Sequence, residues 1–390
     1  MNTLRRLTAD PTRTALLIAG GLGFVVLGAS QALYGPFYPV FRDRFALSAA
    51  QVSLTAALHF TGATAAMSVS GFFTRVFGPL RLVTVSVFVL AAGSFGIAFG
   101  PSWPVVLAAA TLVGVGFGTF VTMNFLVARV FGEAGPAALN TLNAMFGVGG
   151  AVLGPTVAAP FVDIGNHRPV FAAVGAIAFG LAVYFAVTKR LAVPSHPETA
   201  TPQQGMRPYL LPVVGFIVLY FFYMASETSF GNWIPTHLAP AYGPAAAARF
   251  TALFWLAHTV GRLAAAPVSL RMSPSRLAAW AVVLGILATG SASVIPIAPI
   301  AYVVAGFFVG PVFPSGLAWI RLRFPNTPDE VSSVVLAVGG LGSIAAPPLV
   351  GLAVDAFGVT AVPIAITLMM VLAGASTHLL RLAGPRRDRA

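Results

Sequence analysis

Residues 209–238 read YLLPVVGFIVLYFFYMASETSFGNWIPTHL, an apolar run long enough to cross a bilayer as a helix. Glu227 lies deep within this run. A charged, unpaired carboxylate there costs roughly 2.5–3.5 kcal/mol, so such residues usually face a bundle interior or a water-filled path. The other nine acidic residues lie at the ends of apolar runs, in loops or in the tails. We therefore expect Glu227 to bind a proton or a substrate; the alternative is a structural hydrogen bond to a neighbouring helix.

The composition of the chain is that of an integral membrane protein. Of its 390 residues, 57% are hydrophobic and only 8% are charged, whereas a soluble domain carries about 25% charged residues. The 40 glycines and 30 prolines are spread through the apolar runs, as in polytopic helix bundles. These runs lack the alternating polarity of a membrane β-barrel. The sequence therefore predicts an all-α membrane protein.

The charged and reactive residues exclude several other classes of protein. The net charge of +12 comes from basic residues that stand singly or in pairs at the ends of runs, not from a basic stripe that would bind nucleic acid. The chain has no cysteine, so disulfides and thiol catalysis are excluded. No nucleophile–base pair and no metal-ligand spacing is visible. We expect neither an enzyme nor a bound metal or cofactor.

Twelve apolar runs of bilayer length follow one another along the chain. They cover residues 14–40, 49–74, 80–99, 103–131, 137–162, 168–189, 209–238, 245–270, 275–295, 297–321, 330–354 and 359–381. The weakest boundary separates the ninth and tenth runs, where almost no polar turn is present. The longest polar stretch lies in the middle of the chain. We expect an N-terminal six-helix bundle over residues 1–190, a cytoplasmic linker over 191–208 and a C-terminal six-helix bundle over 209–390.

The two halves of the chain repeat each other at a constant offset of 192 residues. The matching positions fall in three pairs of runs: 23–27 with 215–219, Gly114 and Gly118 with Gly306 and Gly310, and Gly147, Gly150, Pro155 and Asp163 with Gly339, Gly342, Pro347 and Asp355. Three pairs at one offset are unlikely by chance. Parallel six-helix repeats are a transporter architecture, with the binding site between the halves near the middle of the bilayer.

The basic residues predict the orientation of the chain in the membrane. When the N-terminus is placed in the cytoplasm, only Arg42, Arg44, Arg168 and Arg249 fall outside, and the other eighteen basic residues fall on the inner side. The N-terminal MNTLRRLTADPTRTALL lacks the cleavage site of a signal peptide. We expect a multi-pass protein of the cell inner (plasma) membrane with both termini and the linker cytoplasmic.

Two segments resemble motifs of the major facilitator superfamily. The loop after the second run reads GFFTRVFGPLR (71–81), a degraded form of the superfamily's loop motif that keeps Arg75 and Arg81 but lacks the acid. The eleventh run ends in GLAVDAFG (351–358), with Asp355 in the superfamily's Gly-x3-Asp-x2-Gly pattern. The resemblance implies twelve transmembrane helices in two pseudo-symmetric six-helix bundles, the major facilitator fold, and structural or gating roles for these three residues.

A finer resemblance is to the fucose-permease and glucose-transporter-like sugar branch of that superfamily. It is carried by residues 114–132, 139–155, 226–238 and 254–265. The resemblance implies a monosaccharide substrate, often moved with a proton or a sodium ion. The chain departs from the branch where proton-coupled members carry acids in the first and fourth helices, because these positions read GASQALYGP and FVTMN here. Asn143 stands where a histidine is often found. Glu227 is then the remaining candidate for proton coupling.

Polar and aromatic side chains within the runs are the candidate substrate ligands. Amides both donate and accept, which matches sugar hydroxyls, although amides in membranes also join helices. Indole and phenol rings stack on sugar faces, and a histidine assists proton transfer or serves structure. The candidates are Gln31, Tyr34, Asn124, Asn140, Asn143, Asn232, Trp255, His258 and Trp319. Asn140 and Asn143 share a helix face, as do Trp255 and His258.

Two arginines lie inside apolar runs. Arg262 either forms an ion pair with an acid or an anionic substrate, or extends to the headgroups from the inner end of its helix. For Arg129, near the end of its run, the structural interpretation is likewise pairing or extension to the headgroups. The many glycines serve close helix packing and gating, because Gly114, Gly116 and Gly118 lack the strand–loop–helix context of a phosphate site.

These observations predict a secondary active transporter that moves a small polar solute, a monosaccharide, by alternating access with a proton carried by Glu227. Export of amphipathic drugs is the alternative, favoured by the 31 phenylalanines and the single acid. A non-transporting membrane receptor is the rival from another class. The expected partners are the small-molecule substrate, a proton or sodium ion and membrane lipids, and we expect the chain to act as a monomer without nucleic acid.

Overall fold

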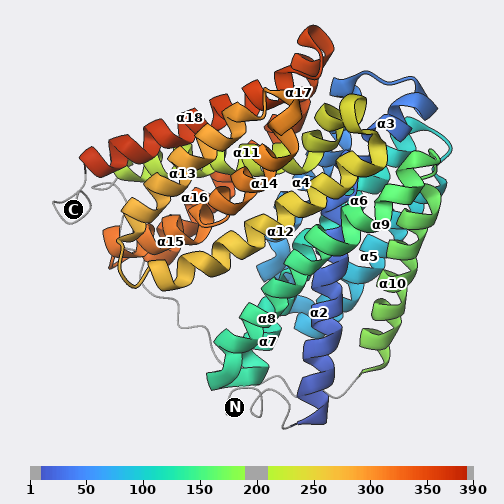
Figure 1. Cartoon of the computed structure of the whole chain (residues 1–390). Coiled ribbons are helices and arrows are strands. Elements are labelled where there is room, and N and C mark those ends of the chain that lie inside the picture. The colour runs from blue at the N-terminus through green and yellow to red at the C-terminus, as the bar shows by residue number, and fades with distance from the viewer. Residues whose placement is uncertain (1–9, 189–209, 384–390) are drawn as a thin grey trace. The chain divides into compact units, whose positions relative to one another are not determined.

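The computed structural model describes residues 10–188 and 210–383, and the predicted linker 191–208 falls outside these ranges. Every regular element in the described part is a helix (Figure 1). The helices occupy all twelve predicted runs. Within the described ranges, ten helical segments are long and apolar enough to cross a membrane. The eighth and ninth runs are also helices, of 25 and 18 residues, and the eighth is made less apolar by Arg249, His258 and Arg262.

The chain divides into two compact units, of which the first comprises Met1–Phe45 and Leu58–Thr199. The helices of this unit are α2 (Pro11–Ala32), α3 (Tyr34–Phe45), most of α4 (Ala49–Phe77), α5 (Pro79–Phe99), α6 (Trp103–Phe120), α7 (Thr122–Phe131), η1 (Gly132–Ala134), α8 (Gly135–Val148), the π-helical η2 (Gly149–Leu153), α9 (Gly154–Asp163) and α10 (Arg168–Val187).

The second unit comprises Ala46–Ala57 and Ala200–Ala390, and therefore includes the first turns of α4. Its other helices are α11 (Leu210–Tyr242), α12 (Pro244–Val268), α13 (Pro274–Ser291), η4 (Ile295–Ile297), α14 (Ala298–Val309), α15 (Val312–Arg323), α16 (Pro328–Gly339), α17 (Leu341–Phe357) and α18 (Ala361–Leu382).

Several predicted runs are interrupted, whereas α11 is continuous. The first, fourth, tenth and eleventh runs each divide into two α-helices, with the tenth divided at Gly310 and Pro311, and the fifth run divides into α8, η2 and α9. In contrast, α11 continues for 33 residues and passes through Pro235 and Pro240, so the seventh run extends beyond its predicted end at Leu238 to Tyr242. Glu227 lies near the middle of this helix. Its carboxyl is therefore carried by an uninterrupted element.

Glycines bring helix backbones into direct contact in both units. A Cβ atom on Gly306 of α14, or on Gly310 directly after it, would lie 2.4 or 2.2 Å from the carbonyl oxygen of Phe254 or His258 on α12. In the first unit, a Cβ atom on Gly114 or Gly118 of α6 would lie 1.9 or 2.2 Å from carbonyl oxygens of α4. The glycines that match at the repeat offset therefore make the same kind of helix contact in each unit, as expected for small residues in membranes.

A buried apolar cluster joins α11, α15, α16 and α18 in the second unit. Trp319 belongs to this cluster and packs edge-to-face on Phe216, with ring centroids 5.0 Å apart. The sequence assigned Trp319 to a substrate face. Since its side chain is buried in the cluster, its indole contributes to packing of the second unit.

Candidate functional site

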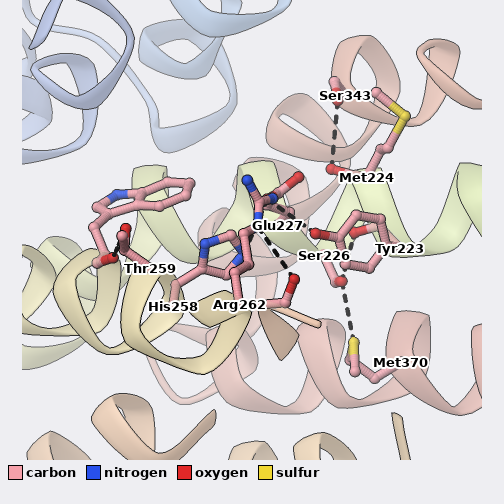
Figure 2. A network of polar contacts seen from close by, with 11 residues as sticks. Tyr223, Met224, Ser226, Glu227, His258, Thr259, Arg262, Ser343 and Met370 are labelled. Carbon is pink, nitrogen blue, oxygen red and sulfur yellow. Dashed lines mark hydrogen bonds and ion pairs between the residues drawn. The ribbon is translucent and has the colours of Figure 1, made fainter. Parts of the chain in front are cut away.

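The candidate site centres on Glu227 and is built from α11 and α12 (Figure 2). Tyr223 stands one turn before Glu227 on α11, and His258 and Arg262 stand one turn apart on α12. Residues four apart project from the same face of a helix. The two faces therefore present two pairs of polar side chains to each other, within the second unit.

One oxygen of Glu227 receives all the polar contacts of the carboxyl group. Tyr223 Oη donates to Oε1 at 3.0 Å, and Arg262 Nη2 donates to the same oxygen at 3.1 Å. His258 Nε2 lies 3.0 Å from Oε1, in a direction that is poor for a hydrogen bond. No described residue donates to Oε2. The carboxyl group thus has one oxygen fixed by the protein and a second that is available.

The side chains of the site differ in exposure, and its two opposite charges lie next to each other. The side chain of Glu227 is 19% exposed and that of His258 is 3% exposed, whereas Arg262 is 40% exposed. Arg262 also lies over the Phe313 ring, 5.9 Å from its centroid. Its guanidinium is always charged and opposes the charge of the carboxylate. The ion pair offsets the cost of placing either charge within an apolar helix bundle.

Arg262 has a second partner in the break between α14 and α15. Its Nε donates to the backbone carbonyl of Gly310 at 3.2 Å. The two bonds use different nitrogens of the guanidinium, so Arg262 links Glu227 of α11 to Gly310, the residue directly after α14. The sequence left open whether this arginine pairs with an acid or extends to the headgroups. The structure shows that it pairs with Glu227.

Trp255 borders the same region, three residues before His258. A Cβ atom on Gly231 would lie 2.9 Å from Trp255 Cζ2, so the missing side chain of Gly231 makes room for the indole. Gly231 is one turn after Glu227 on α11, which places the indole one turn along from the carboxyl group. The buried Nε1 of Trp255 has no hydrogen-bond partner in the described part of the chain. It is a donor available to a bound molecule.

Neighbouring helices hold this part of α11 (Figure 2). Ser226 Oγ donates to the carbonyl of Tyr223 at 2.7 Å and lies 3.1 Å from Met370 Sδ of α18. Ser343 Oγ of α17 donates to the carbonyl of Met224 at 3.4 Å. Glu227 is thus presented by a helix segment that one contact from α18 and one from α17 position.

The remaining candidate in the second unit is an amide that is already engaged. Asn232 is buried, and its Nδ2 donates to the carbonyl of Thr228 at 2.8 Å. This local bond fits the role of a structural amide.

The candidates of the first unit lie in different environments. Tyr34 is buried with its Oη 3.2 Å from Nδ1 of His59. Asn124 Oδ1 is buried and has no partner among the described residues. Asn140 and Asn143 are both exposed, and Asn143 Nδ2 donates to the carbonyl of Leu139 at 2.9 Å. Gln31 is half-buried. Of these, Asn124 offers an unused acceptor.

The residues expected to serve structure or gating lie at helix ends. Arg75, Arg81 and Arg129 are exposed. Asp355 accepts backbone N–H groups from Ala49 at 2.7 Å on Oδ1 and from Ala50 at 2.9 Å on Oδ2. It therefore caps the N-terminus of α4, where four N–H groups lack partners within the helix.

An arginine–histidine pair in the first unit was not predicted from the sequence. Arg44 Nη1 lies 3.0 Å from His167 Nε2, and Arg44 Nη2 donates to the carbonyl of Gly100 at 3.1 Å. His167 stands just before α10, outside the candidate spans. Burial, followed by the positive charges of Arg44 and Arg168, lowers the pKa of His167 to about 4. This imidazole is neutral at physiological pH.

Two members of the Glu227 site were also missed, Tyr223 and Gly310. Tyr223 stands in the aromatic run of α11 and resembles a lipid-facing residue in sequence, but its spacing of four from Glu227 was an available signal. Gly310 was identified as a packing residue only. Its carbonyl enters the site because α12 and α14 approach so closely. In the described part of the chain, no three histidine, aspartate or glutamate side chains gather as metal ligands.

Comparisons with known proteins cover nearly the whole chain. A family model described as "Major Facilitator Superfamily" matches residues 20–243 and 216–390. The chain is 21% identical to the glucose/mannose transporter GlcP of Bacillus subtilis (strain 168) over 344 residues, which are 84% of this chain and 85% of that protein.

Solved structures share the fold. A bacterial homolog of the human lysosomal transporter Spinster, in its inward-facing and occupied conformation, superposes with a TM-score of 0.78 at 15% identity, covering 97% of this chain and 98% of that chain. The xylose transporter XylE from E. coli has a TM-score of 0.70 at 13% identity, covering 92% and 95%. At these identities the likeness concerns the fold.

Proposed function

The chain belongs to the Major Facilitator Superfamily and is a multi-pass membrane transporter rather than an enzyme; from this premise we propose that it moves a monosaccharide together with a proton carried by Glu227. The observation that carries the proposal is the carboxyl group of Glu227, which lies near the middle of α11 with Oε1 fixed and Oε2 available. In a transporter, an ionisable residue inside a span marks an ion or substrate path.

The proton binds Oε2 in this proposal. A proton taken from water on one side of the membrane forms an O–H bond at Oε2 and is released to water on the other side. Oε1 accepts from Tyr223 in both protonation states, and from Arg262 while the carboxyl group is charged. Oε2 changes from an acceptor to a donor when it is protonated. A sugar hydroxyl beside it therefore meets a different partner in each state, which joins sugar binding to proton binding.

Support for a sugar comes from the relative and from the polar groups. The relative that covers most of the chain is named a glucose/mannose transporter. The available indole N–H of Trp255 and the available acceptor of Asn124 suit hydroxyl groups. We propose Trp255, Asn124, Asn140, Asn143 and Gln31 as further substrate ligands.

The transport cycle is proposed to be alternating access by two six-helix bundles, residues 1–190 and 209–390, in a monomer of the plasma membrane. Both termini lie in the cytoplasm in this proposal. The internal repeat and the placement of basic residues support it.

The test is uptake of labelled glucose, mannose and other monosaccharides into proteoliposomes, with and without an inward proton gradient. We compare wild type, Glu227→Gln and Glu330→Gln, which removes an acid from the first turn of α16 instead. Glutamine places its carbonyl at Oε1 and an N–H donor at Oε2, and so imitates protonated Glu227. Wild type and Glu330→Gln should accumulate sugar with the gradient. Glu227→Gln should exchange sugar without accumulating it.

Three outcomes would contradict this proposal. Sugar flux that ignores the gradient and is unchanged in Glu227→Gln would make the protein a uniporter in which Glu227 is structural. Absence of sugar flux under all conditions would remove the substrate assignment, and a panel of amphipathic drugs would then be tested for export. Binding of sugar without flux would indicate a receptor.

A further inference from the structure

The break between α14 and α15 leaves a backbone carbonyl without its helical partner. In an α-helix the carbonyl of residue 310 accepts from the N–H of residue 314. Residue 314 is proline, which has no N–H. Gly310 follows the last residue of α14, and Pro311 separates it from α15. The carbonyl of Gly310 therefore needs a donor from elsewhere.

Arg262 supplies that donor. Its Nε–H bonds the Gly310 carbonyl at 3.2 Å. Gly310 is buried, so its carbonyl, unlike the partly exposed guanidinium, has no water to replace a lost bond, and an unpaired carbonyl within a membrane span is costly. The side chain of Arg262 thus takes the place of the backbone N–H that Pro314 lacks.

Close packing of α12 on α14 makes this reach possible. A Cβ atom on Gly310 would lie 2.2 Å from the carbonyl oxygen of His258 and 3.3 Å from the backbone nitrogen of Arg262. Only glycine allows this approach. A second bond holds the beginning of α15, since Tyr220 Oη donates to the carbonyl of Phe313 at 2.7 Å. The break is therefore joined to α12 by Arg262 and to α11 by Tyr220.

The same guanidinium is held at its other end by Glu227, through Nη2 at 3.1 Å. The carboxylate contributes a charge-assisted hydrogen bond, which is about twice as strong as a neutral one. Arg262 is 40% exposed, so its alternative partner is water. The charge on Glu227 decides how firmly Arg262 stays at the Gly310 carbonyl.

We propose that Arg262 is a positioning residue that transmits the charge state of Glu227 to the break between α14 and α15. The proposal rests on the proposed function in one respect, that Glu227 loses its charge during transport. When Glu227 is neutral, Arg262 turns towards water and the Gly310 carbonyl loses its donor. The segment around Phe313 and Ser315 then opens more often. Tyr223, His258 and Arg262 are the polar groups that face Glu227 in this step.

The experiment is hydrogen–deuterium exchange by mass spectrometry on the purified full chain in nanodiscs, without substrate. The peptide of interest covers residues 311–319. Glu227→Gln should raise its exchange about tenfold, the effect of losing one hydrogen bond to a charged group. Arg262→Lys keeps the positive charge but removes the Nε–H donor, and should raise exchange by a similar factor.

Two proline variants serve as matched partners. Pro314→Ala restores an N–H that bonds the Gly310 carbonyl, so adding Glu227→Gln in that background should leave exchange unchanged. Pro311→Ala removes the neighbouring proline but leaves the Gly310 carbonyl dependent on Arg262. The effect of Glu227→Gln should persist there.

The outcomes separate this proposal from the proposed function. Equal exchange in wild type and Glu227→Gln would overturn the role of Arg262, even if Glu227 proves to couple protons in proteoliposomes. An effect of Glu227→Gln that survives Pro314→Ala would also overturn it, since the Gly310 carbonyl would not be the link. Raised exchange together with unchanged transport in Glu227→Gln would instead contradict proton coupling and leave the link intact.

Discussion

The behaviour of Glu227 depends on the donors around it more than on its depth in the helix. Two donors and an imidazole meet at one carboxyl oxygen. The fixed oxygen orients the group, and the available oxygen faces whatever enters the site. We therefore expect the hydroxyl group of Tyr223 to influence proton coupling without being essential for folding.

Removing the hydroxyl of Tyr223 tests this expectation. Tyr223→Phe loses one bond to Glu227, worth about 1 kcal/mol, and should lower gradient-driven accumulation about fivefold. Tyr302→Phe is the control, because it removes a similar buried hydroxyl that pairs with His237 at 2.9 Å in the same unit. Proteoliposome uptake and melting temperature are measured for both. Equal loss of accumulation in the two variants would show that only general packing matters.

His167 is expected to make the stability of the chain depend on pH. Its pKa in the folded chain is about 4 and its usual value is 6.5. Between these values the unfolded chain binds a proton that the folded chain does not bind, so stability falls as pH drops through this window. Above about pH 6.5, His167 is neutral in both the folded and the unfolded chain, so its protonation no longer lowers the stability. We expect a loss of about 1–2 kcal/mol by pH 4, after allowance for solvent screening of the arginine charges.

Melting temperatures at pH 7 and pH 4.5 check this result. His167→Gln should reduce the difference between the two temperatures, whereas His378→Gln, on the exposed face of α18, should leave it unchanged. If the difference between the two melting temperatures is the same in His167→Gln as in wild type, other groups control the response of stability to acid.

At the level of elements, backbone contacts between helices depend on particular glycines. In Gly114→Ala, the new methyl group would lie 1.9 Å from the carbonyl oxygen of His59, and no flexible side chain can move away. We expect a loss of about 1–3 kcal/mol from overpacking. Gly180→Ala is the matched control in α10, because nothing lies within 4 Å of its new Cβ atom. Thermal unfolding in detergent should separate the two variants, and equal stability would contradict the packing argument.

The approximate extent of each apolar run could be predicted from the sequence, but the interruptions within the runs could not. Apolar runs of bilayer length give the extents directly. Prolines did not identify the interruptions, since α11 passes through Pro235 and Pro240 while the tenth run divides at Gly310 and Pro311. Whether a proline divides a helix depends on which neighbouring groups satisfy the freed carbonyl. That information lies in other helices and not in the local sequence.

At the scale of the whole molecule, the basic residues predict an orientation that can be measured. The chain contains no cysteine, so a single introduced one reports on its own position. Ile164→Cys, between α9 and α10, should react with a membrane-impermeant maleimide on intact cells. Leu270→Cys, between α12 and α13, should react only after the cells are opened. Both side chains are exposed. The reverse pattern would invert the predicted orientation.

The site was predicted in part. Glu227 could be found because a carboxyl in an apolar run is rare and costly, and Arg262 and His258 because they are polar residues on one face of a span. Their meeting could not be predicted, because it depends on how α12 packs against α11 and α14. Trp319 resembled Trp255 in sequence, yet Trp319 lies in an apolar cluster and Trp255 packs at Gly231, one turn after Glu227 on α11.

The proline at position 314 also has a consequence for the evolution of the protein. Because Pro314 makes the Gly310 carbonyl depend on Arg262, the two positions are constrained as a pair. A lineage that first replaced the proline could afterwards replace the arginine without leaving the Gly310 carbonyl unpaired. The opposite order would pass through an intermediate that has neither donor. Descendants of this chain should therefore change position 314 before position 262.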